Sequence, residues 1–97
     1  MFYVYILASI NRVFYVGSTD NLARRVDEHK KGRATAFTKK YRVNRLVYYE
    51  PAESRPAAVH RELEIKAWRR EKKIALIESM NPSWTDVVLE PPAQTPR

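Results

Sequence analysis

The sequence contains no cysteine, has only 2 glycines, and has no long apolar run. Without cysteine, disulfides, thiolate catalysis and cysteine-ligated zinc sites are all excluded. The apolar N-terminal stretch MFYVYILA is far shorter than the roughly 18 residues that span a bilayer. The same stretch lacks the basic leader of a signal peptide. We therefore expect a cytoplasmic protein with no membrane partner.

Acidic residues are outnumbered by basic ones. The chain has 18 Lys and Arg against 11 Asp and Glu, which gives a formal net charge of +7 over 97 residues. Such an excess repels itself in the folded chain unless an anionic partner compensates it. Nucleic acid is the leading partner that this charge indicates, ahead of an acidic membrane surface.

The apolar segments and the turns between them predict the element order β-β-α-β-α-α. Strands are expected at residues 2–8, 13–16 and 46–50. The first two are joined by a short turn, which predicts an N-terminal antiparallel hairpin. Helices are expected at residues 21–31, 54–70 and 71–80.

The predicted fold class is α/β, of the α+β type, with a small three-stranded sheet flanked by helices. The length favours one domain, which we place at residues 1–88. Residues 89–97 are rich in proline, and we expect them to form a disordered tail. The basic segment 33–40 is expected to be an exposed loop.

Two polar residues share the core-facing side of the first predicted helix. At 100° per residue, Arg25 and His29 project on the same side as Leu22 and Val26. A buried unpaired charge is very costly, so Arg25 must either be paired or point into a cleft. On the helix alone, the simpler interpretation is an Arg and a His with packed stems and solvated heads.

The second predicted helix places a carboxylate in a similar position. Glu62 projects into an apolar stripe, whereas Glu64 points toward solvent. The Glu62 carboxylate therefore needs a partner, either a basic side chain such as Arg25 or Lys66 or a divalent cation. On the helix alone, the ion pair is the favoured interpretation.

The order and spacing of several short motifs resemble those of the GIY-YIG nucleases. Y-V-Y at residues 3–5 and Y-V-G at residues 15–17 are similar to the two signature strands of that superfamily. The similarity continues as Y-V-G-S-x-x-x-L-x-x-R-x-x-x-H, and then as R-E-L-E-I-K and N-P-S-W. It covers the chain up to about Val88 and is closest in kind to the small, stand-alone bacterial branch. The chain departs from the signature at Tyr3, which replaces the first glycine, and at two valines that replace isoleucines.

The resemblance implies hydrolysis of phosphodiester bonds with a divalent metal, Mg²⁺ or Mn²⁺. It matches Glu62 to the metal-binding glutamate and Arg25 to the arginine that neutralises charge on the scissile phosphate. Tyr5 and Tyr15 match the signature tyrosines, one of which activates or positions the attacking water. His29 matches a position that assists proton transfer. These residue types suit the chemistry, because fixed positive charge stabilises the negative charge that develops on phosphate.

We therefore interpret the chain as a metal-dependent DNA endonuclease, with RNA as an alternative substrate. Because no separate recognition domain is evident, we expect it to recognise DNA structure or backbone more than sequence, in a setting such as DNA repair or recombination. The expected phosphate contacts are the basic residues Arg33, Lys39, Lys40, Arg69, Arg70, Lys72 and Lys73. Two alternatives remain: a non-catalytic nucleic-acid-binding module with the same fold, and an adaptor that docks a protein through its basic face. The sequence predicts no specific protein partner.

Overall fold

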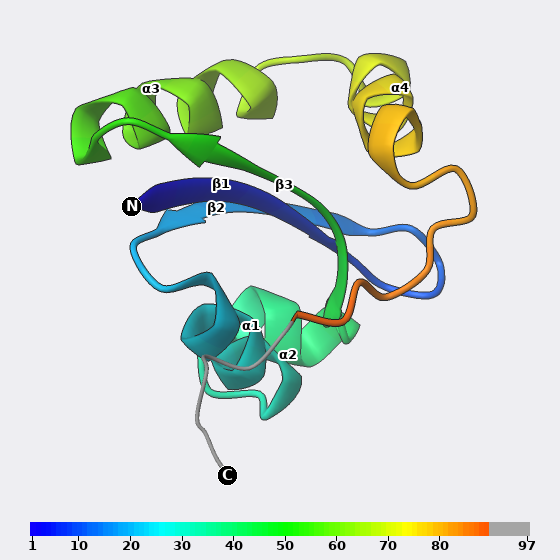
Figure 1. Cartoon of the computed structure of the whole chain (residues 1–97). Coiled ribbons are helices and arrows are strands. Elements are labelled where there is room, and N and C mark those ends of the chain that lie inside the picture. The colour runs from blue at the N-terminus through cyan, green and yellow to red at the C-terminus, as the bar shows by residue number, and fades with distance from the viewer. Residues whose placement is uncertain (90–97) are drawn as a thin grey trace, which may run out of the picture.

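A computed structural model describes residues 1–89 of the chain (Figure 1). Its elements are, in order, β1 (Phe2–Ala8), β2 (Phe14–Thr19), α1 (Leu22–Lys30), α2 (Ala36–Tyr41), β3 (Arg45–Ala52), α3 (Arg55–Lys66) and α4 (Arg70–Met80). Nearly all of the tail predicted at residues 89–97 lies outside the described residues. Among residues 1–89, every helix is too short or too polar to cross a membrane.

The three strands form one antiparallel sheet in the order β2-β1-β3. The hairpin partner β2 is therefore an edge strand, and β1 lies in the centre. Helices α1 and α2 lie on one face of the sheet, whereas α3 and α4 lie on the other (Figure 1). The predicted three-stranded sheet, its N-terminal hairpin and its flanking helices are confirmed.

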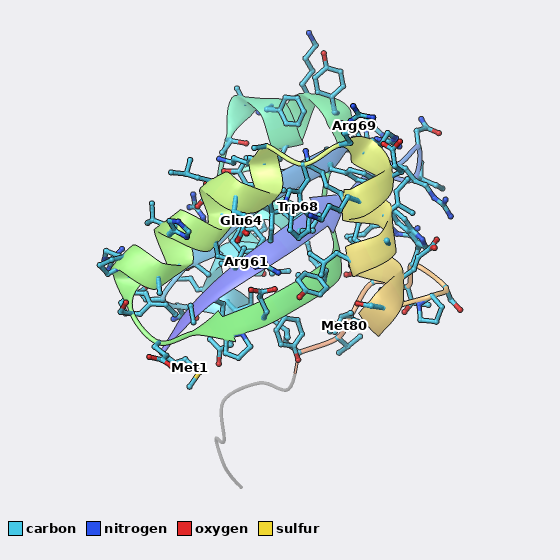
Figure 2. All side chains as sticks on the ribbon, turned by 90° about the horizontal axis from the view of Figure 1, so that it is seen from above. Met1, Arg61, Glu64, Trp68, Arg69 and Met80 are labelled. Carbon is cyan, nitrogen blue, oxygen red and sulfur yellow. The ribbon has the colours of Figure 1, made fainter. Side chains whose placement is uncertain are left out.

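The central strand serves two separate cores, because successive side chains of a strand point to opposite faces. Val4 and Ile6 pack on the side of α3 and α4, whose ribbons cross that face in Figure 2. Tyr5 and Leu7 pack on the side of α1. All four side chains are at most 1% exposed. Two-sided burial explains why β1 is apolar along its whole length.

The prediction of an exposed loop at residues 33–40 is wrong, because this segment contains the start of α2. Thr35 caps the helix, since its Oγ1 accepts a hydrogen bond from the Thr38 backbone N–H at 3.0 Å. Arg42 ends the helix in the left-handed conformation, with φ of 55°. The observed order is therefore β-β-α-α-β-α-α, with one short helix more than predicted.

Two predicted boundaries differ from the structure by three or more residues, and the others by at most two. Strand β2 runs through Gly17 to Thr19 instead of ending at residue 16. Helix α3 ends at Lys66 instead of residue 70. The half-buried Trp68 packs against the core in the connection to α4, with the Lys72 ammonium 4.2 Å from its ring centroid. The helix ends here although the adjoining residues include neither glycine nor proline.

Candidate active site

Tyr5 lies at the centre of the candidate site and is only 1% exposed. It pairs directly with Gly17 across the β1–β2 hairpin. A Cβ atom on Gly17 would lie 2.5 Å from the Tyr5 hydroxyl oxygen, which is far inside contact distance. The phenol ring therefore crosses the backbone of β2, and only glycine leaves room for it.

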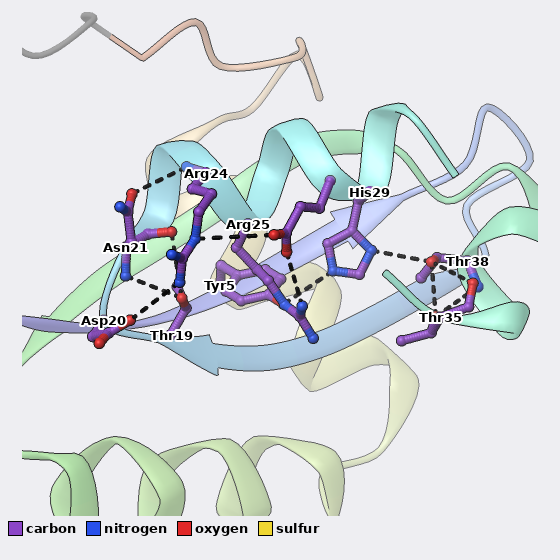
Figure 3. Close-up of polar contacts among 10 residues, drawn as sticks. Tyr5, Thr19, Asp20, Asn21, Arg24, Arg25, His29, Thr35 and Thr38 are labelled. Atoms are coloured by element: carbon purple, nitrogen blue, oxygen red, sulfur yellow. Dashed lines mark hydrogen bonds and ion pairs between the residues drawn. The ribbon is translucent and has the colours of Figure 1, made fainter. Parts of the chain in front are cut away.

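His29 of α1 is buried and links Tyr5 to α2 (Figure 3). Its Nε2 lies 3.1 Å from the Tyr5 hydroxyl oxygen, and its Nδ1 lies 3.0 Å from Oγ1 of Thr38. Burial, together with the positive charge of Arg25, lowers the pKa of His29 from 6.5 to about 4. The imidazole is therefore neutral at physiological pH.

We assign the tautomer of this neutral imidazole from the surrounding hydroxyls. Oγ1 of Thr38 lies 2.8 Å from Oγ1 of Thr35 and donates a 3.3 Å hydrogen bond to the Thr35 carbonyl oxygen, which can only accept. Oγ1 of Thr38 then accepts a hydrogen bond from Nδ1–H of His29. The unprotonated Nε2 of His29 in turn accepts a hydrogen bond from the Tyr5 hydroxyl.

Tyr5 keeps its proton at neutral pH in this environment. Burial raises its pKa from 10.0 to about 12, although the neighbouring Arg25 opposes the shift. Tyr15 of β2 is half-buried, and its ring centroid lies 5.1 Å from that of His29 and 6.3 Å from that of Tyr5. Both tyrosines and the histidine thus form one aromatic cluster under α1.

Arg25 borders this cluster from the middle of α1, as the helical projection predicted. Its side chain is 34% exposed, and Nη1 donates a hydrogen bond of 3.0 Å to Oε1 of Glu28. The hydrogen bond to Glu28 raises the pKa of Arg25 further. Glu28 is itself half-buried and holds the guanidinium at the site.

Glu62 comes from α3, on the opposite face of the sheet, and reaches the site at edge strand β2. Its Oε1 accepts a 2.6 Å hydrogen bond from Oγ of Ser18, and its Oε2 accepts a 2.6 Å bond from Nζ of Lys66. Lys66 is one of the two ion-pair partners expected from the sequence. Ser18 follows Gly17 in β2, so Glu62 and Tyr5 contact neighbouring residues of the same strand. The five candidate residues therefore lie in two groups, with β2 between them.

Glu62 is suited to bind a divalent cation. Its side chain is 18% exposed, and its present partner is the ammonium of Lys66, whose side chain is 45% exposed. Residues 1–89 contain no group of three or more His, Asp or Glu residues that could hold a metal. A single carboxylate fits Mg²⁺, which keeps most of its water ligands when proteins bind it.

The predicted phosphate contacts do not form one surface. Arg33, Lys39 and Lys40 lie in or just before α2, whereas the other four lie at the start of α4, across the sheet (Figure 1). Some of the second set are already engaged. Nη2 of Arg70 donates a 2.8 Å hydrogen bond to the Arg12 carbonyl oxygen.

Three residues of the site were missed by the sequence analysis, namely Ser18, Glu28 and Thr38. Ser18 was visible as part of the Y-V-G-S motif, but its bond to a helix 44 residues away was not. Thr38 was missed because its segment was expected to be a loop. Its burial depends on the formation of α2, which turns its hydroxyl inward to His29.

The chain is similar to known proteins over most of its length. The family model described as the GIY-YIG catalytic domain matches residues 1–75. A UPF0213 protein of Haloquadratum walsbyi is 41% identical over 76 residues, covering 78% of this chain and 85% of the relative. A UPF0213 protein of Staphylococcus haemolyticus is 38% identical over 76 residues, covering 78% of this chain and 93% of the relative.

A solved structure shares the fold. The solution NMR structure of a UPF0213 protein from Bacillus halodurans matches with a TM-score of 0.55 and 30% sequence identity. The match covers 87% of this chain and 90% of that chain. The residues matched by the family model include Tyr5, Tyr15, Arg25, His29 and Glu62.

Proposed function

The chain belongs to the GIY-YIG catalytic-domain family, and from this premise we propose that it is a metal-dependent endonuclease that hydrolyses phosphodiester bonds in DNA. The family is one of nucleases, which implies a nucleic-acid substrate. The observation that carries the proposal is the buried hydrogen bond between Tyr5 and a neutral His29 beside the Arg25 guanidinium. The half-buried carboxylate of Glu62 at the edge of β2 supports it from the other face.

In this proposal Arg25 binds the scissile phosphate. Its guanidinium stays protonated at any physiological pH, and a planar guanidinium can bond two phosphate oxygens at once. Glu28 holds only Nη1, which leaves other N–H donors for the substrate. Because Glu28 fixes the side chain before substrate binds, the positive charge is in place when negative charge develops in the transition state.

Tyr5 and His29 carry the proton transfer, and Tyr15 orients the attacking water. Tyr5 has a pKa of about 12 and is a poor base alone, but its proton already points at the free Nε2 of His29. As Tyr5 takes a proton from the water, it passes its own proton to His29. The hydroxide so formed attacks phosphorus, the bond from phosphorus to the leaving sugar oxygen breaks, and that oxygen takes a proton from solvent. The arriving phosphate adds negative charge beside His29, which raises the pKa of the imidazole and favours this transfer.

Glu62 would hold the divalent metal, Mg²⁺ or Mn²⁺, after Lys66 moves away. When bound there, the metal supplies positive charge to the phosphate and lowers the pKa of a bound water. Ser18 keeps one carboxylate oxygen of Glu62 fixed, so the other oxygen is the one released by Lys66. The same hydroxyl joins the Glu62 group to the strand that carries Tyr15.

The substrate in this proposal is recognised by backbone and shape. The described residues contribute no domain beyond the catalytic fold, and the basic side chains around it would contact phosphates of any sequence. DNA repair or recombination is a fitting setting for such recognition. RNA is an alternative substrate, because both nucleic acids offer the same phosphate charge.

A cleavage assay with matched variants tests the proposal. Labelled duplex, nicked, flapped, branched and single-stranded DNAs, and RNA, are incubated with Mg²⁺, Mn²⁺ or EDTA. We expect metal-dependent cutting by the wild type and loss of cutting in Glu62→Gln. The control is Glu64→Gln, because Glu64 lies on the same helix, is 46% exposed and pairs only with Arg61 in the described structure. It should cut like the wild type.

Other results would decide against parts of the proposal. Cutting that persists in Glu62→Gln means that Glu62 does not hold the metal. Binding without cutting in any metal favours the non-catalytic binding module instead. Full single-turnover rates in both Tyr5→Phe and Tyr15→Phe would remove the tyrosines from the mechanism.

A further inference from the structure

Helix α2 presents an exposed pair of aromatic rings. Phe37 is 43% exposed and Tyr41 is 45% exposed, and their ring centroids lie 5.0 Å apart. Every other aromatic residue among residues 1–89 is buried or half-buried. Exposure of two large rings together is unusual in a small domain, since it leaves apolar surface in water. A ligand with a flat apolar face would cover this surface.

The rings lie within a strongly basic segment. From residue 29 to residue 49 the chain has no acidic residue, and its cations are Lys30, Lys31, Arg33, Lys39, Lys40, Arg42 and Arg45. The ammonium of Lys40 lies 5.3 Å from the ring centroid of Tyr41. Within the described part of the chain, Lys39, Lys40 and Arg42 form no salt bridge. Their charge is thus available to an anionic partner.

The inner side of the same short helix belongs to the candidate active site. Thr38 follows Phe37 in sequence and bonds the buried ring of His29. A polar hollow of about 260 Å³ lies where α1 and α2 meet, and its lining includes His29, Lys39 and Arg42. A ligand on the outer face of α2 would therefore lie within about one helical turn of the site proposed for chemistry.

We propose that Phe37 and Tyr41 form a platform on which an unpaired nucleobase of the bound strand stacks, while Lys39, Lys40 and Arg42 bind the flanking phosphates. Base stacking on aromatic side chains between cations is how proteins hold single strands. The bases of an intact duplex are stacked on each other, so they cannot use such a platform. Resting on the proposed function, this inference adds that the substrate is unpaired beside the bond that is cut.

Equilibrium binding in EDTA tests the platform without requiring cleavage. Fluorescence anisotropy measures the affinity of the protein for a labelled single strand, for the same strand with abasic spacers, and for the matched duplex. The wild type should bind the normal strand about tenfold more tightly than the abasic strand, since one stacked base contributes that much. The variant Phe37→Leu/Tyr41→Leu should bind both strands equally, at the wild-type affinity for the abasic strand.

Three controls separate stacking from charge and from folding. Leucine keeps the apolar contact between positions 37 and 41 that braces the helix, so loss of affinity reflects loss of the flat rings. Leu63→Ala changes an apolar side chain that is 60% exposed on α3, and it should bind like the wild type. Lys40→Gln/Arg42→Gln should reduce the slope of log K against log salt by about two, because two phosphate contacts are lost. The aromatic variant should leave that slope unchanged.

The outcomes distinguish this inference from the proposed nuclease. Equal affinity of the wild type for normal and abasic strands overturns the platform, with no variant needed. Tighter binding of the duplex also overturns it, and absence of any nucleic-acid binding overturns it in favour of a protein partner. Cutting without base dependence leaves the nuclease intact and removes the platform. Base-dependent binding without cutting does the reverse.

Discussion

Gly17 and Tyr5 illustrate, at the scale of single residues, how closely the backbone and the site are fitted. In Gly17→Ala the new methyl would lie 2.5 Å from the Tyr5 hydroxyl, and the buried ring has no space to move aside. We expect the free energy of unfolding to fall by roughly 1–3 kcal/mol, the usual cost of overpacking. Cleavage should be lost as well, because the ring is pushed off His29. Urea denaturation and the cleavage assay measure both effects.

The matched control for this variant is Gly32→Ala. Gly32 has φ of +70°, so alanine is strained there, but the nearest side-chain atom lies 3.5 Å from the new Cβ, in ordinary contact. The cost should be about 1 kcal/mol from backbone strain, with cleavage preserved. If Gly17→Ala cuts like Gly32→Ala, the packing of Tyr5 against β2 is not needed for the site.

The buried His29 makes stability depend on pH. Its pKa is 6.5 in the unfolded chain and about 4 in the folded one, so between these values the unfolded state binds more protons. Stability is therefore greatest above pH 6.5 and falls as pH decreases toward 4, by roughly 3 kcal/mol at most. Denaturation curves measured across this range should show the decline. In His29→Gln the decline in stability with falling pH should be much shallower. An equally steep decline in that variant would mean that other groups cause it.

Thr38 is expected to act as a positioning residue that fixes the tautomer of His29. Thr38→Val keeps the shape but removes the acceptor for Nδ1–H, so the proton can move to Nε2 and block the bond from Tyr5. Cleavage should fall about tenfold or more, within the range that acid–base catalysis contributes. Thr38→Ser should restore it. A purely structural role would lower stability in Thr38→Val without changing the pH profile of cleavage.

At the scale of elements, Asp86 ties three segments together. Its Oδ1 accepts a 2.9 Å hydrogen bond from the Leu46 backbone N–H of β3, and its Oδ2 pairs with Lys30 of α1. Asp86→Ala should reduce the free energy of unfolding by about 1–3 kcal/mol, because a backbone donor loses a charged acceptor. Asp27→Ala is the control. Its pair with Lys31 is exposed on both sides and should contribute less than about 1 kcal/mol.

Some elements could be predicted from the sequence alone. Strand β1 was predicted with its observed bounds, because a run buried on both faces is unambiguous. Arg25 and His29 were placed on the inner face of α1 from helical periodicity alone. Helix α2 could not be predicted in this way, since it is six residues long and its stability depends on the Thr35 cap and on packing of Thr38. The end of α3 depends equally on the burial of Trp68.

At the scale of the whole molecule, the positive charge is divided between two faces of the sheet. The sequence predicted phosphate contacts in both sets, but only the α2 set lies on the side of Arg25 and His29 (Figure 1). Lys39→Gln/Lys40→Gln should therefore weaken DNA binding and reduce the slope of log K against log salt by about two. Lys72→Gln/Lys73→Gln should leave that slope nearly unchanged. Equal effects of the two pairs would mean that DNA contacts both faces.

The sequence could not predict that the candidate site draws residues from helices on both faces of the sheet. Periodicity placed Glu62 on an inward face of its helix, but it could not tell which face of the sheet that helix covers. The face that α3 covers depends on the chain topology. Helix α3 follows the edge strand β3 and packs on the face of the sheet opposite to α1. The bond between Ser18 and Glu62 is a consequence of this packing and has no local signal.

For the proposed nuclease, the pairing of Lys66 with Glu62 has a consequence for the order in which substrate and metal bind. A bare carboxylate at the edge of the site would repel an approaching phosphate chain, whereas the lysine ammonium cancels that repulsion. In the proposed nuclease, the nucleic-acid strand would therefore bind first and the metal afterwards. Lys66, once displaced by the metal, would then offer its positive charge to the strand already bound. In the resting molecule Lys66 therefore occupies the place proposed for the metal. Metal binding would both complete the site and release the lysine to contact a substrate phosphate.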